Sequence, residues 1–101
     1  MYFGLYGKLV AKPGEADRVI EILNRNLDAL SEVGCLLYVI NQQADALETI
    51  WVTEVWLSSE HHEASLQLPE VRAAINEAMP LLTGEFDQVR LSTMGGLGLV
   101  V

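Results

Sequence analysis

The pattern of apolar residues in the first third of the chain changes from strand-like to helix-like. Residues 2–12 are rich in aromatic and aliphatic side chains and end at the turn signal Lys12-Pro13-Gly14, so we expect a strand there. Charged residues fill the next segment, where apolar residues recur three and four positions apart: Ala16, Val19, Ile20, Leu23, Leu27 and Leu30. This spacing predicts one amphipathic helix of about 17 residues that ends near Gly34, a usual position for a helix-terminating glycine.

Three further segments have the apolar and β-branched composition of strands. They span residues 35–40, 48–57 and 86–94, and a polar connection over residues 41–47 joins the first two. Residues 95–101 follow the last strand as a glycine-rich, apolar C-terminal arm.

The segment between the last two strands predicts a helix in two pieces. Ser58 and Ser59 are suited to cap a short helix over residues 60–67. Pro69 suits the first turn of the next helix, whose apolar face holds Val71, Ile75, Ala78, Met79 and Leu82. The order β-α-β-β-α-β is the ferredoxin-like pattern, an α+β fold with helices on one face of an antiparallel sheet. We expect a single domain over residues 1–101.

The predicted strands are apolar on both faces. In the strand over residues 48–57 the large apolar side chains alternate, with Trp51, Val55 and Leu57 on one side and Ile50, Val52 and Trp56 on the other. Two helices cover only one face, and an antiparallel sheet with a wet face should alternate apolar with polar residues. We therefore expect a second copy of the chain on the other face, in a homodimer joined sheet to sheet.

The amino-acid composition indicates which binding partners and which cellular compartment to expect. The chain has 6 Lys and Arg against 14 Asp and Glu, a net charge of −8, which argues against binding nucleic acid or anionic membranes by bulk electrostatics. The single cysteine, Cys35, excludes an internal disulfide framework and favours a reducing compartment. The N-terminal residues lack a signal-peptide pattern, and no apolar run approaches the ~20 residues of a membrane span. We expect a small, acidic, cytoplasmic domain.

Four short strings, in this order along the chain, are similar to those of a known family. They are Lys12-Pro13-Gly14-Glu15, Glu32-Val33-Gly34-Cys35-Leu36-Leu37-Tyr38, Glu54-Val55-Trp56-Leu57-Ser58-Ser59-Glu60 and Leu66-Gln67-Leu68-Pro69. Through them, most of the chain resembles the antibiotic biosynthesis monooxygenase family. The resemblance implies a dimeric α+β barrel that binds small aromatic or quinol-like substrates, and many members oxygenate them without flavin, haem or metal. Other members degrade haem or process small signalling molecules, and the fold alone does not choose among these activities.

At several positions this sequence departs from the patterns of the family, and these departures narrow the choice among the family's activities. Ser65 stands where many relatives carry a histidine and haem-degrading relatives carry a tryptophan. Ile75 stands where the haem-degrading relatives carry a histidine, and the first strand lacks their asparagine, which disfavours haem degradation. A relative that makes aromatic polyketide quinones carries an asparagine and a tyrosine at the positions of Val52 and His62. The resemblance therefore makes Val52, His62 and Ser65 candidate pocket positions.

Four side chains are candidates for binding or proton transfer. Trp56 is either an aromatic pocket wall or a packing residue of the core or dimer. Glu54 lies on the same strand face as Trp56. In an apolar pocket the pKa of Glu54 would rise, so that it could take a proton from a phenol. Alternatively, Glu54 pairs with Arg72 or turns to solvent. His62 is the preferred base because histidine titrates near neutrality, and a solvated helix histidine is the alternative. Tyr38 lines either the pocket or the core.

Other polar residues have simpler interpretations. His61 and His62 are adjacent, so they point about 100° apart on a helix and cannot hold a metal as an i, i+4 pair does. We predict no metal site and a solvated His61. Cys35 is interpreted as a buried structural thiol, and no helix follows the glycines of residues 95–98, as a phosphate-binding loop would require.

Two functions remain open. The first is a cofactor-independent monooxygenase, in which His62, or Glu54 in its place, ionises a small quinol held against Trp56 so that the substrate passes an electron to dioxygen. The second is a dimer of the same fold that binds or senses a small molecule without catalysis, which Ser65 and Val52 favour.

Overall fold

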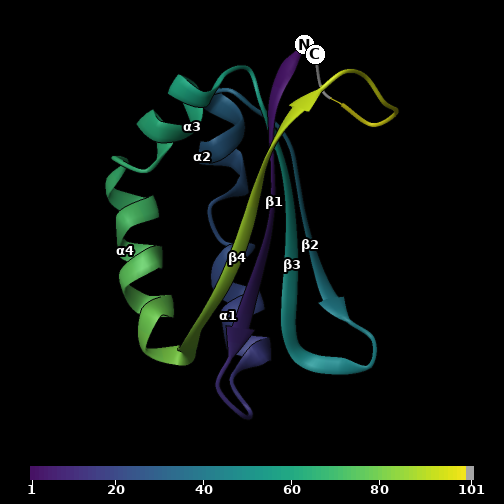
Figure 1. The fold of residues 1–101 in the computed structure, drawn as a ribbon. Coiled ribbons are helices and arrows are strands. Elements are labelled where there is room, and N and C mark those ends of the chain that lie inside the picture. Colours follow the sequence, from purple (N-terminus) through teal and green to yellow (C-terminus); the bar gives the residue numbers. More distant parts are fainter. Residues whose placement is uncertain (100–101) are drawn as a thin grey trace.

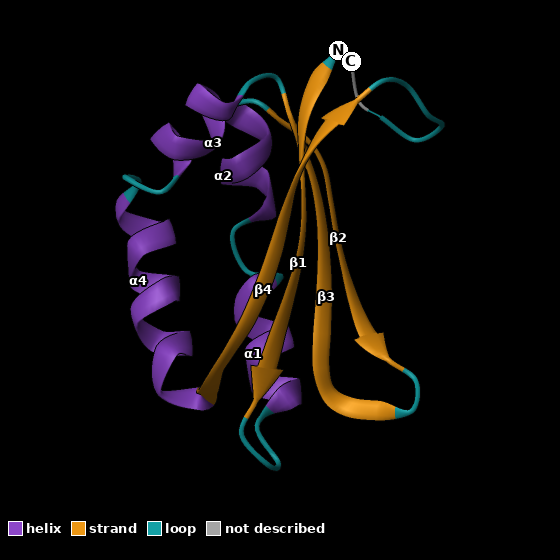
Figure 2. Cartoon of the chain, viewed as in Figure 1, coloured by secondary structure: helices purple, strands orange, loops and turns teal. Residues whose placement is uncertain are grey.

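Four strands form one antiparallel sheet in the order β2-β3-β1-β4, and the helices pack on one side of it (Figures 1 and 2). The computed structural model describes residues 1–99. The strands are β1 (Tyr2–Ala11), β2 (Cys35–Gln43), β3 (Ala46–Trp56) and β4 (Leu82–Thr93). The helices are α1 (Ala16–Leu23), α2 (Leu27–Glu32), α3 (Ser59–Ser65) and α4 (Pro69–Ala78), followed by the 3₁₀ turn η1 (Met79–Leu81). This arrangement confirms the predicted α+β, ferredoxin-like class.

The single helix predicted after the first strand is wrong, because the chain forms α1 and α2 with a break between them. At the end of α1 the Asn24 side chain donates to the Ile20 carbonyl oxygen (3.0 Å). Asn26 occupies the N-cap position of α2 without a side-chain capping hydrogen bond, and its side-chain amide donates instead to the Glu70 carbonyl oxygen in α4 (3.0 Å). Asparagine side chains compete with the helix for backbone hydrogen bonds, which apolar periodicity does not reveal. The break therefore comes from these two amides.

The strands also extend beyond their predicted limits. The segment expected as a polar connection forms the end of the β2–β3 hairpin, where the Gln42 amide donates to the Leu47 carbonyl oxygen (2.7 Å) and Gln43 accepts from the Trp51 indole (2.8 Å). β4 begins at Leu82 instead of residue 86, and a bulge at its start uses Gly84 at a φ of 93°. Polar side chains at strand ends hide these boundaries from the alternation pattern. Of the predicted arm, residues 95–99 lack regular structure, and residues 100–101 lie outside the described part.

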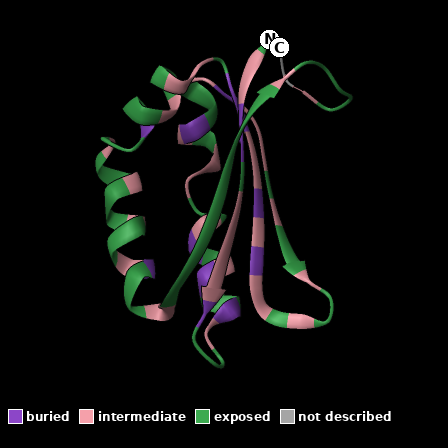
Figure 3. Ribbon diagram, viewed as in Figure 1, coloured by how far each residue is buried: buried purple, intermediate pink, exposed green. Residues whose placement is uncertain are grey.

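Eight of the buried side chains form two clusters on the helix side of the sheet. Figure 3 marks the buried residues along the ribbon, with several of them on β3 and α1. The first lies under α1 and contains Ala11, Ala16, Val19, Ile50 and Val52. The second lies where α2 meets the sheet and contains Leu30, Cys35 and Trp56. Ile50, Val52, Glu54 and Trp56 alternate along one face of β3, so a single strand passes through both clusters and the space between them.

The opposite face of the sheet has no helix over it among residues 1–99 (Figure 2). Tyr6 of β1 and Trp51 of β3 stack there with ring centroids 5.1 Å apart. The register places Val39 and Val89 on this same face, and both are exposed. The predicted apolar character of this second face is therefore present.

Candidate functional site

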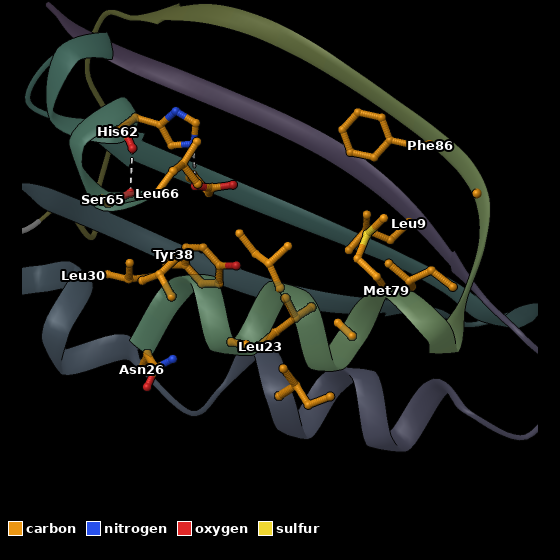
Figure 4. A pocket seen from close by; sticks show the side chains of 18 of the residues that line it. Leu9, Leu23, Asn26, Leu30, Tyr38, His62, Ser65, Leu66, Met79 and Phe86 are labelled. Atoms are coloured by element: carbon orange, nitrogen blue, oxygen red, sulfur yellow. Dashed lines mark hydrogen bonds and ion pairs between the residues drawn. The ribbon is translucent and has the colours of Figure 1, made fainter. Parts of the chain in front are cut away.

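A pocket of about 570 Å³ lies between the sheet and the helices, and its size is within the usual range of small-molecule sites (Figure 4). Figure 4 shows Tyr38, His62 and Ser65 at one end, and Leu9, Met79 and Phe86 at the other. α4 lines the pocket between the two ends with Val71, Ala74, Ile75 and Ala78. Glu54 and Trp56 of β3 also line it.

Glu54 projects from β3 into this space. Its Oε1 accepts a hydrogen bond from the Trp56 indole Nε1 at 3.0 Å, as expected for residues two apart on one strand face. The side chain is only 16% exposed, and burial raises the pKa of the carboxyl, while the Trp56 hydrogen bond opposes that rise. Arg72 is exposed, so the predicted alternative of a Glu54–Arg72 pair does not hold.

His62 reaches the same place from α3, which begins with the Ser58 side chain accepting from the His61 backbone N–H (3.2 Å). Its ring lies edge-on to Trp56, with centroids 5.4 Å apart, and its Nε2 is 3.9 Å from Glu54 Oε1. That distance is too long for a hydrogen bond but within ion-pair range once the ring is protonated. Burial is the main cause that lowers the pKa of His62, and the positive charge of Arg90 adds to it. The imidazole is therefore neutral at pH 7 and able to accept a proton.

Tyr38 is opposite Glu54 in the β2–β3 register. Burial raises the pKa of its hydroxyl, and the nearby negative charge of Glu54 raises it further, so Tyr38 keeps its proton at neutral pH. Cys35 is buried against Leu30 and Trp56, and burial raises the pKa of its thiol to about 11. A thiol with that pKa is inert at neutral pH, in agreement with a structural role.

Three other predicted residues occupy less accessible positions. Val52 packs in the core cluster under α1 and does not line the pocket. The buried Ser65 hydroxyl donates to the His62 carbonyl oxygen (2.6 Å), which ties it to its own helix. Trp56 is only 1% exposed, so little of its indole is open for a ligand to stack on. Its indole donates a hydrogen bond to Glu54 and lies against the edge of the His62 ring.

His61 points away from the pocket, as the sequence predicts. Its Nδ1 lies 2.6 Å from the Ser58 hydroxyl, and its ring covers Gly34, which has a φ of 107°. A Cβ at Gly34 would approach the His61 ring to 2.8 Å, so this contact needs glycine as well. His61 therefore has a structural role at the junction of α2, β2 and α3.

Sequence reasoning missed the residues from α2 and from the start of β4. Asn26 lines the pocket and joins the helix break to α4. Met79 and Phe86 stand at the far end and are exposed, although both are large and apolar. The two asparagines near the break were an available signal for the first group. The apolar face predicted for residues 69–82 already contained Met79, whereas nothing in the pattern marks Phe86 as a pocket residue.

Residues 1–99 were also compared with the requirements of a metal site and of a membrane-spanning helix. Nowhere in this part of the chain do three His, Cys, Asp or Glu side chains come close enough together to hold a metal ion. None of the helices in these residues is long and apolar enough to cross a lipid bilayer.

Solved structures resemble the chain over nearly its whole length. A candidate antibiotic biosynthesis monooxygenase from Chloroflexus aurantiacus J-10-fl is 39% identical, with a TM-score of 0.81 over 97% of this chain and 100% of that chain. A second candidate of that name, from Nitrosomonas europaea, is 14% identical, with a TM-score of 0.82 over 95% of this chain and 90% of that one. A third, from Caulobacter crescentus CB15, is 20% identical, with a TM-score of 0.80 over 93% and 91%. The last two show likeness of fold only.

The sequence profile of one family agrees with these structural neighbours. No match is found among curated protein sequences. The profile described as "Antibiotic biosynthesis monooxygenase" matches residues 3–77, which include β1 through most of α4 and hold Tyr38, Glu54, Trp56 and His62. With that match and the 39% identity to the Chloroflexus protein, the chain belongs to the antibiotic biosynthesis monooxygenase family.

Proposed function

We propose that the protein is a cofactor-independent monooxygenase that acts on a small quinol or related aromatic molecule. The observation that carries the proposal is the buried pair of His62 and Glu54, 3.9 Å apart at one end of a largely apolar pocket. A neutral imidazole in such surroundings is a competent base for a phenolic hydroxyl. The resulting quinolate is electron-rich, and a dry pocket favours its reaction with dioxygen over side reactions with water.

Each polar residue has a distinct role in this reaction. His62 takes the substrate proton, and Glu54 stabilises the imidazolium that forms, since an opposite charge nearby favours the protonated ring. Trp56 fixes the Glu54 carboxylate through its hydrogen bond. Tyr38 keeps its proton and offers a donor to a second substrate oxygen. The substrate supplies all four electrons that dioxygen accepts: a quinol and dioxygen give a hydroxyquinone and water, so one oxygen atom replaces a ring hydrogen and the other leaves as water.

One observation favours the non-catalytic alternative. At position 65, where many relatives carry a histidine, the chain has a buried serine. The Ser65 hydroxyl donates its hydrogen bond to the His62 carbonyl oxygen. The site thus lacks a second imidazole, and a pocket that only binds or senses a small molecule needs none.

The proposal includes a homodimer located in the cytoplasm. Tyr6, Val39, Val89 and Leu91 are exposed on the uncovered face of the sheet, and contiguous exposed apolar residues mark interaction surfaces. A two-fold axis through this face would bury the patch of each chain against the other. In the cytoplasm the thiol of Cys35 stays reduced.

Oxygen consumption by purified, metal-free protein with a panel of benzoquinols and naphthoquinols tests the function. We expect uptake above the rate of spontaneous quinol oxidation, with one atom of labelled dioxygen found in the product by mass spectrometry. Heat-denatured protein is the control. Saturable quinol binding without oxygen uptake would support the binding module instead.

A further inference from the structure

The pocket is polar at one end and apolar at the other. Tyr38, Glu54 and His62 gather where α3 meets the sheet. Figure 4 shows Leu9, Met79 and Phe86 at the opposite end, where α4 gives way to β4. The α4 wall between the two ends is entirely apolar. A ligand that fills both ends therefore needs a polar head and an apolar body.

The apolar end opens to solvent between large side chains. Phe86 is 58% exposed, and Met79 and Ile75 are exposed beside it, although all three line the pocket. Apolar surface gathered at the mouth of a pocket is covered favourably by an apolar segment of the ligand. The mouth thus suits an apolar chain that leaves the pocket, although Thr83 and Glu85 also line the pocket beside Phe86.

The charges around the pocket select against anions. No Lys or Arg is among its lining residues within 1–99, whereas Glu54 and Glu85 are. Glu85 pairs with Lys8 (3.2 Å) on the outside, and the Arg90 guanidinium lies over the Phe3 ring, 4.8 Å from its centroid. A buried ligand anion would lose its hydration without contacting a cation among these lining residues.

A neutral hydroxyl, in contrast, finds a partner at the polar end. A carboxylate has about four acceptor positions, and the indole N–H of Trp56 occupies one on Glu54. The remaining positions, together with the neutral His62 ring, accept from a phenolic O–H.

We propose that the pocket binds a neutral phenol or quinol that bears an alkyl or isoprenoid tail, with the hydroxyl at Glu54 and His62 and the tail leaving between Met79 and Phe86. The inference deepens the proposed function and rests on it only for the place of the reacting head group. It adds to that function the shape, charge and orientation of the ligand.

The test measures affinity by calorimetry for 4-ethylphenol, 4-butylphenol and 4-hexylphenol, and for 4-hexylbenzoate. We expect each added methylene to tighten binding roughly threefold to fourfold until the chain clears the mouth, as burial of apolar surface requires. 4-Hexylbenzoate should bind at least tenfold more weakly than 4-hexylphenol. Equal affinities along the alkyl series, or a benzoate that binds as tightly as the phenol, would overturn the proposal.

Variants locate the tail. Phe86→Asp should weaken 4-hexylphenol more than 4-ethylphenol and so flatten the dependence on chain length, and Met79→Asp gives an independent second test. Leu47→Asp is the matched control, because Leu47 is also 58% exposed but lies in the β2–β3 hairpin away from the pocket. A chain-length dependence that neither Phe86→Asp nor Met79→Asp changes would place the tail elsewhere and contradict the proposed orientation.

Oxygen uptake with an unsubstituted naphthoquinol separates the two proposals. Oxygen uptake without any chain-length effect on affinity would contradict the proposed tail and support the monooxygenase. A chain-length effect without oxygen uptake would contradict the monooxygenase and support a binding site for tailed phenols.

Discussion

The indole N–H of Trp56 donates to the carboxylate of Glu54, two residues before it on the same face of β3. The indole is buried on all sides, so its function in the pocket is to hold that carboxylate in place, with little surface left for stacking on a ligand. Trp56→Ala would open a cavity in the core and cost about 3–5 kcal/mol of folding free energy, which obscures any effect on binding. Trp56→Phe removes only the donor and is the better probe.

We expect Trp56→Phe to raise the pKa of Glu54 further above its ordinary value. The hydrogen bond from Trp56 favours the charged carboxylate and is the influence that lowers this pKa. The titration of the Glu54 side-chain carbon signal by NMR measures the change. An unchanged midpoint in a folded variant would mean that Trp56 does not hold the carboxylate.

Glu54→Gln should stabilise the protein at neutral pH. Burial raises the folded-state pKa of Glu54 above 4.5, so the folded protein bears the cost of a buried charge at every pH above that raised pKa. The cost disappears as the pH falls through the raised pKa to below the unfolded value. The stabilisation should therefore be full at pH 8 and absent near pH 4. Thermal unfolding at the two pH values checks this, with Glu63→Gln on the exposed side of α3 as the control.

His62→Ala should slow quinol oxidation by about 10²-fold or more, as the loss of a general base does, and weaken ligand binding much less, because Glu54 can still accept from the substrate hydroxyl. His61→Ala is the control, because its ring lies against Gly34 outside the pocket. Steady-state oxygen uptake and binding are measured on the same preparations. If both variants behave alike, or neither changes turnover, His62 is not the base and Glu54 takes its place.

Arg90→Gln distinguishes the two candidate bases. The charge of Arg90 lowers the pKa of His62, but it is not among the influences on the pKa of Glu54. Activity that needs neutral His62 is lost as the pH falls through the His62 pKa, which lies below 6.5. Removing Arg90 should move this acidic limb of the pH–rate profile to higher pH. A limb that stays in place argues for Glu54.

The uncovered face of the sheet predicts a dimer. Light scattering at micromolar concentration should give about twice the chain mass of 11.1 kDa. Val89→Asp, in the middle of the exposed patch, should shift the mass towards one chain, whereas Leu47→Asp should not. A folded wild-type monomer under these conditions would contradict the proposed assembly.

The periodicity of apolar residues predicts the order of strands and helices, but it does not predict which residues line the pocket. Val52 and Glu54 are two residues apart, and the sequence places both on the strand face that also holds Trp56. α1 covers Val52, whereas the pocket lies over Glu54, and that difference depends on how the helices are spaced in three dimensions. The helix break at Asn24 and Asn26 also depends on contacts that periodicity does not reveal. The Asn24 amide donates to a carbonyl oxygen of its own helix, and the Asn26 amide donates to a carbonyl oxygen of α4.

The position of the two core clusters on either side of the pocket has an evolutionary consequence. The side chains that hold the fold together, such as Val19 and Ile50, are separate from those that line the mouth, such as Ile75, Met79 and Phe86. Substitutions at exposed positions of this kind usually change folding free energy by less than about 0.5 kcal/mol. A lineage can therefore exchange mouth residues, and with them the ligand, while the backbone is conserved.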